Sequence, residues 1–161
     1  MRLLHPTDYQ PEAASRFVSA RSQIQRLLPS AVVEHIGSSA IPGALSKGDL
    51  DICVLVAPTH HELYVLTLTN FGYVEKRDTL RTEQLCMLEW HKPGEEHAVQ
   101  LVASGSPFEM FMAFRDALIA RPALVAEYNQ LKLNAAHLCE VEYRAAKSTF
   151  IERVIRETKL Q

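Results

Sequence analysis

Hydrophobic and polar positions follow two spacings along this chain, and their order predicts a helix followed by a pair of strands. From Pro11 to Leu28 apolar residues recur at helical spacing while arginine and glutamine fill the other side, which predicts an amphipathic helix ending at Pro29. The next stretch, AVVEHI, is β-branched and short, and LDICVLV is a continuous apolar run typical of a central strand covered on both faces. Two strands therefore flank residues 37–48.

The rest of the chain predicts a second helix, further strands and a helical end. The second helix runs from Pro58 to about Phe71 and is ended by Gly72. Three strands of a mixed or antiparallel sheet are predicted in YVEKRD, EQLCMLEWH and HAVQLV. Helical spacing returns after Gly105 and restarts at Pro122, so we expect helices from there to the C-terminus.

Length and composition predict one globular domain. The chain has 161 residues, of which 47% are hydrophobic and 22% charged, enough to bury a core without disulfides. We predict a single α+β domain over residues 1–161, strand-rich at about 30–103 after the first helix and helical at about 106–160.

The sequence shows no membrane or secretory segment. No apolar run approaches the length that crosses a bilayer, and the N-terminus lacks the apolar core and cleavage site of a secretory signal. We therefore expect a cytoplasmic protein without a membrane partner. Cys53, Cys86 and Cys139 are odd in number and far apart, and the first two lie in apolar runs, which predicts buried free thiols rather than disulfides or a zinc site.

The overall charge argues against non-specific binding of nucleic acid. The formal net charge is −2 at pH 7, so no general field attracts a phosphate backbone. The sequence leaves open a local basic patch, which could form on folding if the following residues converge: Lys47, Arg77, Arg81, Arg115, Lys132 and Lys147.

Two acids one residue apart mark the start of the apolar run LDICVLV. In an extended strand Asp49 and Asp51 would face the same way and repel each other, unless solvent or a hard divalent cation such as Mg²⁺ or Mn²⁺ compensates them. Upstream, Gly37, Ser38 and Ser39 offer a closely approachable backbone and donors suited to phosphate oxygens. Either motif alone is often a solvated turn. The combination with a buried strand favours a phosphate-and-metal site.

The segment HIGSSAIPGALSKGDLDI resembles the signature of the GrpB family, whose members resemble the nucleotidyltransferase superfamily. The likeness covers nearly the whole chain, because AFRDALIARPALVAEYNQLKLNAA and YRAAKSTFIERVI are similar to that family's C-terminal segments. Residues at matching places there are Arg115, Asp116, Tyr128, Lys132, Tyr143 and Lys147. The resemblance implies a nucleotidyltransferase-like mixed sheet flanked by helices, with Gly37 and Ser38 at the nucleotide phosphates and Asp49 and Asp51 at the metal.

The chain departs from this pattern at the third acid. Active nucleotidyltransferases generally present another carboxylate from a neighbouring strand, for two-metal transfer. Gln100 stands at the equivalent place in HAVQLV, and a neutral amide supplies neither negative charge nor a base. Glu89 is a weaker candidate for the third acid. His97 keeps half of a family His-x-x-His, and Gly48 replaces a usual proline, which loosens the loop before Asp49.

Several further residues have two interpretations. Lys47 is either a phosphate contact or an exposed lysine. Lys132, Lys147 and Arg115 would by themselves be surface residues or partners in helix-stabilising pairs, and the resemblance favours a role with phosphate. His35 either faces the ligand or is a hydrogen-bonded structural histidine.

Two functions from different classes follow, with a third below them. The first is a Mg²⁺-dependent nucleotidyltransferase acting on an unknown acceptor. The second is a non-catalytic protein that binds a nucleotide or another phosphorylated small molecule, because its catalytic set is incomplete. The third is an interaction module that retains the fold with an idle pocket.

Overall fold

A five-stranded mixed sheet forms the centre of the protein. The structure is a computed structural model that describes residues 1–160. Gln161, the last residue of the predicted domain, lies outside the described part. The strand order is β1-β2-β5-β4-β3, and β2 and β5 run parallel while all other neighbours are antiparallel. The strands are β1 (Val32–Ile36), β2 (Asp51–Val56), β3 (Val74–Glu75), β4 (Leu85–Trp90) and β5 (His97–Ala103). The predicted α+β class with a mixed sheet is confirmed.

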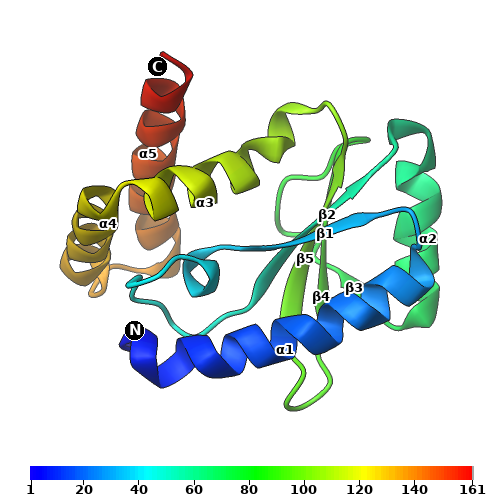
Figure 1. The fold of residues 1–161 in the computed structure, drawn as a ribbon, viewed down its shortest axis with the longest axis horizontal. Helices are drawn as coiled ribbons and strands as arrows, with labels where there is room; N and C mark the ends of the chain where they lie inside the picture. Colours follow the sequence, from blue (N-terminus) through cyan, green and yellow to red (C-terminus); the bar gives the residue numbers. More distant parts are fainter. Residues whose placement is uncertain (161) are drawn as a thin grey trace.

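Helices flank this sheet in two groups, as Figure 1 shows: α1 and α2 pack along it, and α3, α4 and α5 gather on the side away from α2. The helices are α1 (Pro6–Leu27), α2 (His61–Phe71), α3 (Met110–Ala120), α4 (Pro122–Ala135) and α5 (Glu140–Lys159). Short 3₁₀ turns are η1 (Ser38–Ala40), η2 (Pro58–His60) and η3 (Pro107–Glu109). Within residues 1–160, no helix is long and apolar enough to cross a membrane.

Helix α1 begins at Pro6, five residues before the predicted start. The His5 side chain accepts a hydrogen bond from the Thr7 N–H and caps the helix, and Pro6 occupies a position where its missing N–H costs nothing. Pro11 lies inside the helix. Tyr9 is buried and its hydroxyl donates to the Ala44 carbonyl at 2.7 Å, so tertiary contacts of the first turn outweigh the hydrogen bond that Pro11 removes.

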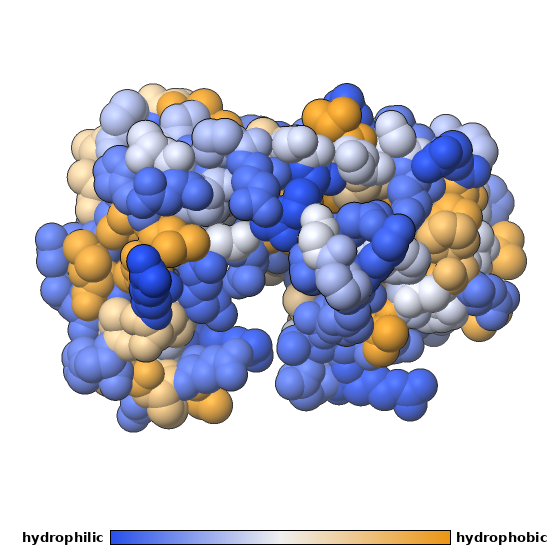
Figure 2. All heavy atoms as spheres, turned by 90° about the horizontal axis from the view of Figure 1, so that it is seen from below, coloured by the Kyte–Doolittle hydropathy of each residue, from blue (hydrophilic) through white to orange (hydrophobic). Residues whose placement is uncertain are grey.

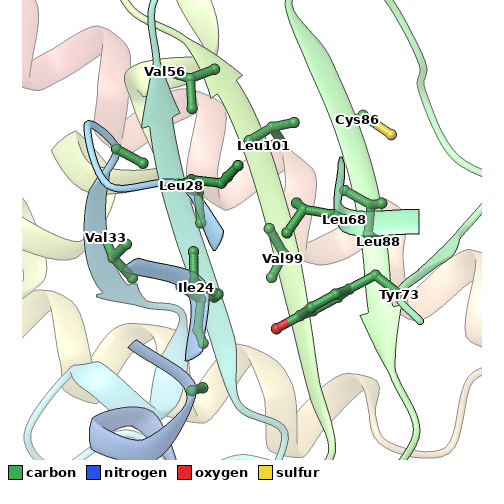
Figure 3. Close-up of a cluster of buried hydrophobic side chains, with 14 of the residues drawn as sticks. Ile24, Leu28, Val33, Val56, Leu68, Tyr73, Cys86, Leu88, Val99 and Leu101 are labelled. Carbon is green, nitrogen blue, oxygen red and sulfur yellow. The ribbon is translucent and has the colours of Figure 1, made fainter. Parts of the chain in front are cut away.

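The core covers both faces of strand β2, as the apolar run predicts. Residues of one face pack against α1 and α2. Figure 3 shows Ile24 of α1, Leu28 just after it and Leu68 of α2 beside Val33, Val99 and Leu101 of the sheet. On the other face Cys53 and Val102 pack against residues of η3 and α3. Cys53 and Cys86 are buried free thiols, as predicted, and Cys139 is an exposed one.

The topology brings four strand ends to one edge of the sheet. Strand β1 ends at Ile36, which pairs with Asp51 at the start of β2, and Asp51 pairs in turn with Ala98 near the start of β5. The end of β4 lies beside them, since Trp90 pairs with His97. The third cluster of buried residues, formed by α3, α4 and α5 with Ile41 and Ala44, packs the C-terminal helices against the loop at this edge.

Candidate functional site

The carboxylate of Asp51 packs directly against the backbone of Gly37. A Cβ atom built on Gly37 would lie 2.7 Å from the Asp51 Oδ2 atom, and Gly37 has φ +74°, which side chains with a Cβ rarely adopt. Only glycine therefore allows this strand-to-turn connection and the close approach of the acid. The sequence predicted that Gly37 lets a ligand approach the backbone, and in the protein the nearest group is the carboxylate itself.

The loop between β1 and β2 is fixed by side chains of α1 and α4. Gln10 of α1 donates to the Ser38 and Ile41 carbonyls at 3.2 and 2.8 Å. Asn129 of α4 donates to the Gly43 carbonyl and accepts from the Leu45 N–H, both at 2.8 Å. These four hydrogen bonds join the loop to α1 and α4.

Gly48 adds a local requirement just before the acids. It has φ +98°, its N–H donates to the Ser46 hydroxyl at 3.1 Å, and its carbonyl accepts from Arg16 at 3.1 Å. Proline could supply neither this φ nor the N–H donor. Gly48 therefore adopts a conformation that a proline at this position could not adopt.

Two cavities meet at Asp51. The first, called the α5 cavity, has a volume of about 410 Å³ and lies between the sheet edge and the C-terminal helices. Its polar residues are Gly37, Ser38, Asp51, Gln100, Lys147, Ser148 and Glu152, and its apolar wall includes Met110, Phe111, Phe114, Tyr128, Ile151 and Ile155.

The second, called the β4 cavity, has a volume of about 320 Å³ and lies between the ends of β4 and β5 and the first turn of α5. It is lined by Asp49, Asp51, Lys47, Arg16, Lys76, Glu89, Trp90 and His97, and by Glu140 and Arg144 of α5. Figure 2, a view from below, shows the surface notched between the helical part at left and the sheet at right, with hydrophilic residues on both sides.

The two acids share the β4 cavity, and they differ in burial. Strand β2 begins at Asp51, so Asp49 lies ahead of the strand, in the loop. Asp49 is exposed, with the Lys47 Nζ atom 3.8 Å from its carboxylate, whereas Asp51 is half-buried. Burial, and then the nearby charge of Asp49, raise the pKa of Asp51 from 3.8 to about 6, while Lys147 and Lys47 act in the opposite direction. Asp51 thus carries a charge that the surrounding protein compensates incompletely.

This donor set suits one hard cation that keeps water ligands. Two carboxylates, with space beside them for water and phosphate oxygens, match the way in which proteins hold Mg²⁺. In the described part of the chain, no group of three or more His, Cys, Asp or Glu side chains is arranged to hold a metal. A complete protein cage is therefore absent from residues 1–160.

Gln100 lies where a third carboxylate would be expected. It pairs with Cys53, two residues after Asp51, so its side chain is on the same face of the sheet, and it lines the α5 cavity. Glu89 is in one row with Asp51 and Ala98, but two strands away, which is roughly 10 Å. Its carboxylate lies 3.9 Å from the Lys76 amine.

The predicted phosphate contacts lie in four environments, of which the two cavities are the first two. Gly37, Ser38 and Lys147 line the α5 cavity with Asp51. Lys47 lines the β4 cavity. Burial lowers the pKa of Lys147 despite the opposing effect of the two acids.

Lys132 lies behind the α5 cavity rather than in its wall. It is 2% exposed, donates to the Ser38 hydroxyl at 3.1 Å and to the Leu45 carbonyl, and has its amine 4.1 Å from the centroid of the Tyr128 ring. Burial, and then the charge of Lys147, lower the pKa of Lys132 to about 7. Its observed contacts position Ser38.

Arg115 and Ser39 lie outside both cavities. The Arg115 guanidinium binds Glu34 at 2.7 Å and donates to the His35 carbonyl at 2.9 Å, so it joins α3 to β1. The Ser39 hydroxyl is hydrogen-bonded to His35 Nε2 at 2.8 Å. His35 stacks on Phe17 and faces α1, on the side of the sheet away from Asp51. This arrangement matches the structural interpretation of His35.

Helix α5 contributes more of the site than the sequence indicated. The helix carries an apolar stripe that includes Phe150, Ile151, Val154 and Ile155, of which Phe150 and Val154 are buried. Ile151 and Ile155 instead line the α5 cavity, together with Ser148 and Glu152. The available signal was the width of the stripe, because two adjacent apolar rows exceed what one core contact requires.

Comparison with known proteins shows the family. The family model described as GrpB protein matches residues 5–157. A UPF0157 protein of Vibrio cholerae is 47% identical over 155 residues, which cover 96% of this chain and 82% of that protein. A UPF0157 protein of Deinococcus radiodurans is 33% identical over 147 residues, covering 89% of this chain and 76% of that one.

Solved structures agree with this result. GrpB from Enterococcus faecalis superposes with a TM-score of 0.76 at 25% identity, over 97% of this chain and 96% of that chain. The Cid1 poly(U) polymerase has a TM-score of 0.53 at 17% identity, over 80% of this chain and 41% of that one, which shows a shared fold. The chain therefore belongs to the GrpB family and has a nucleotidyltransferase-like fold.

Proposed function

We propose that this protein is a Mg²⁺-dependent nucleotidyltransferase, which transfers a nucleoside monophosphate to the hydroxyl of an acceptor. The observation that carries the proposal is the Asp51 carboxylate, which packs against Gly37 in the wall of a 410 Å³ cavity. A cavity of this size, with a few polar groups at one end and apolar side chains at the other, suits a nucleotide. With these substrates the protein would act in the cytoplasm, where nucleoside triphosphates and Mg²⁺ occur.

The acids, the residues of the α5 cavity and its apolar wall have separate proposed roles. Asp49 and Asp51 would hold Mg²⁺, which supplies charge neutralisation at the phosphates. Ser38 and Lys147 would contact phosphate oxygens, with Lys132 keeping the Ser38 hydroxyl in position. The apolar wall would take the base and sugar. Cid1 structures bound to MgATP and MgGTP support a metal–nucleotide ligand for this fold.

The transfer would exchange one phosphorus–oxygen bond for another. The acceptor oxygen forms a bond to the α-phosphorus of the triphosphate, the bond to the departing pyrophosphate oxygen breaks, and the hydroxyl proton leaves. Gln100 cannot take that proton, because an amide is not a base at neutral pH. The proton would therefore pass to water, and we expect a slow enzyme compared with those that present a third carboxylate.

Gln100 also motivates the alternative, a protein that binds a nucleotide or phosphorylated metabolite without turnover. The two functions share their ligand and differ in chemistry. Calorimetry with Mg²⁺ and each NTP measures binding, and release of labelled pyrophosphate in the presence of cell extract measures transfer. Wild type, Asp49→Asn, Asp51→Asn and the exposed control Asp116→Asn would be compared.

The outcomes separate the proposals. Transfer that is lost in Asp51→Asn and retained in Asp116→Asn supports the enzyme. Binding of an NTP that is never turned over supports the alternative. If wild type binds no NTP with Mg²⁺ or Mn²⁺, both proposals are wrong.

A further inference from the structure

The two cavities that meet at Asp51 differ in character, and a transferase needs two substrates at one carboxylate. The α5 cavity has an extended apolar wall that includes Phe111 and Ile151. The β4 cavity is lined mostly by polar and charged residues. Asp51 lines both, so molecules in the two cavities would approach each other there.

Lys76 and Lys47 give the β4 cavity unused hydrogen-bond donors. The Lys76 side chain is 22% exposed, and its amine lies 3.6 Å from an Asp78 oxygen and 3.9 Å from a Glu89 oxygen. The Lys47 amine lies 3.8 Å from an Asp49 oxygen. These separations exceed hydrogen-bond distance. Each amine is therefore held by a loose ion pair rather than by a hydrogen bond, and it retains the capacity to donate to an anion.

The other charged groups of this cavity have closer partners. Arg16 is held by the Glu96 and Gly48 carbonyls at 2.9 and 3.1 Å, with the Glu96 carboxylate at 3.9 Å. Arg144 binds Glu140 at 2.7 Å. With Asp49 and Asp51 assigned to the cation, the positively charged groups of this cavity without such a close partner are the two lysines.

We propose that the β4 cavity is the acceptor site and takes a small hydroxylated molecule that carries a phosphate or carboxylate group. Lys76 and Lys47 bind the anionic group, and the hydroxyl lies toward Asp51, beside the nucleotide in the α5 cavity. The inference rests on the proposed function, because an acceptor site has meaning only if the α5 cavity binds the nucleotide.

The chain contains a built-in probe for this cavity. Trp90 is its single tryptophan and lines the β4 cavity, so its indole N–H resonance reports occupancy of that cavity. Titration of ¹⁵N-labelled protein with sodium phosphate or sodium acetate, with glycerol as the neutral control, should shift this resonance saturably for at least one anion. The two anions show which group the site prefers.

Variants identify the cavity that is responsible. Lys76→Gln should weaken the anion about tenfold, the value of one hydrogen bond to a charged group, and Lys92→Gln, an exposed lysine outside both cavities, should not change it. An indole that no anion shifts overturns the inference. So does a shift that survives Lys76→Gln and disappears in Lys147→Gln, because the anion is then in the α5 cavity.

A parallel titration with MgATP, followed by calorimetry, separates this inference from the proposed function. MgATP binding without an anion response at Trp90 overturns the acceptor site alone. An anion response that depends on Lys76, in a protein that does not bind MgATP, overturns the acceptor role together with the proposed function.

Discussion

Replacing Asp51 by asparagine should stabilise the metal-free protein at neutral pH while removing its proposed metal ligand. Asp51 is half-buried against Gly37, and its pKa rises from 3.8 to about 6, first through burial and then through Asp49. Asparagine keeps the shape of the side chain and removes the charge. If Asp51 served only to pack the folded protein, removing its charge would not be expected to raise the free energy of unfolding.

The magnitude and pH range follow from the direction of the shift. Below pH 3.8 the carboxyl is protonated in both the folded and unfolded states and contributes no difference. Between pH 4 and 6 the unfolded chain releases the proton first, so stability falls as the pH rises, and above pH 6 the loss is constant. A pKa change from 3.8 to about 6 corresponds to about 3 kcal/mol, and because water reaches part of Asp51 we expect a gain of about 1–3 kcal/mol for Asp51→Asn at pH 7.

Urea unfolding in a metal-chelating buffer at pH 4, 5, 6, 7 and 8 measures this effect. The wild type and Asp51→Asn curves should converge near pH 4 and separate by pH 7, with equal m-values. Asp49→Asn is the matched control, because Asp49 is exposed and should change stability much less. Equal or lower stability of Asp51→Asn at pH 7 would refute the view that this carboxylate is poorly compensated in the protein alone.

Three further changes test the surroundings of the site. Gly37→Ala should abolish MgATP binding and destabilise the fold by more than the cost of about 1–2 kcal/mol for a non-glycine residue in a left-handed conformation, because its Cβ meets the Asp51 carboxylate. Gly94→Ala is the control in urea unfolding: at φ +84° and with nothing within 4 Å of its Cβ, it shows the backbone cost alone. Lys132→Met should raise the urea midpoint more at pH 6 than at pH 9, since above its pKa of about 7 the wild-type amine is already neutral in the folded state, and an equal gain at both pH values would contradict this. Arg115→Met should cost about 1–3 kcal/mol of stability through its 2.7 Å ion pair with β1, whereas a change in nucleotide affinity at unchanged stability would favour the phosphate role that the family resemblance implied.

The fold could be predicted wherever one residue pattern determined one element. The apolar run of β2 and the proline and glycine that bound α2 gave strands and helices close to those observed. The start of α1 was misplaced, because the first turn is stabilised by contacts of Tyr9 with a loop 35 residues away, which no local pattern records. Sheet order was equally inaccessible, since it depends on which strands meet after folding.

The part of the candidate site formed by residues close in sequence could be predicted, and the part formed by distant segments could be predicted less well. Gly37 and Asp51 are close in sequence and joined by paired strands, so the motif alone placed them together. Lys132 and Lys147 lie on different helices, and their sequence positions did not show that one is buried behind the wall while the other lines it. The β4 cavity joins residues from α1, three strands and α5, so it exists only in the folded chain.

Burial disfavours the charged forms of both Asp51 and Lys147, the two opposite charges of the α5 cavity. It raises the pKa of Asp51 and lowers that of Lys147, so each group is pushed toward its neutral form, although the two charges partly compensate each other. A cation at Asp51 would remove the first penalty, and a phosphate at Lys147 would remove the second. A metal ion bound alone would neutralise Asp51 and so leave the charge of Lys147 less compensated. A phosphate bound alone would neutralise Lys147 and leave the charge of Asp51 less compensated. The electrostatics of this site therefore favour binding of the metal and the phosphate together, which is the form in which a Mg²⁺–nucleotide presents them.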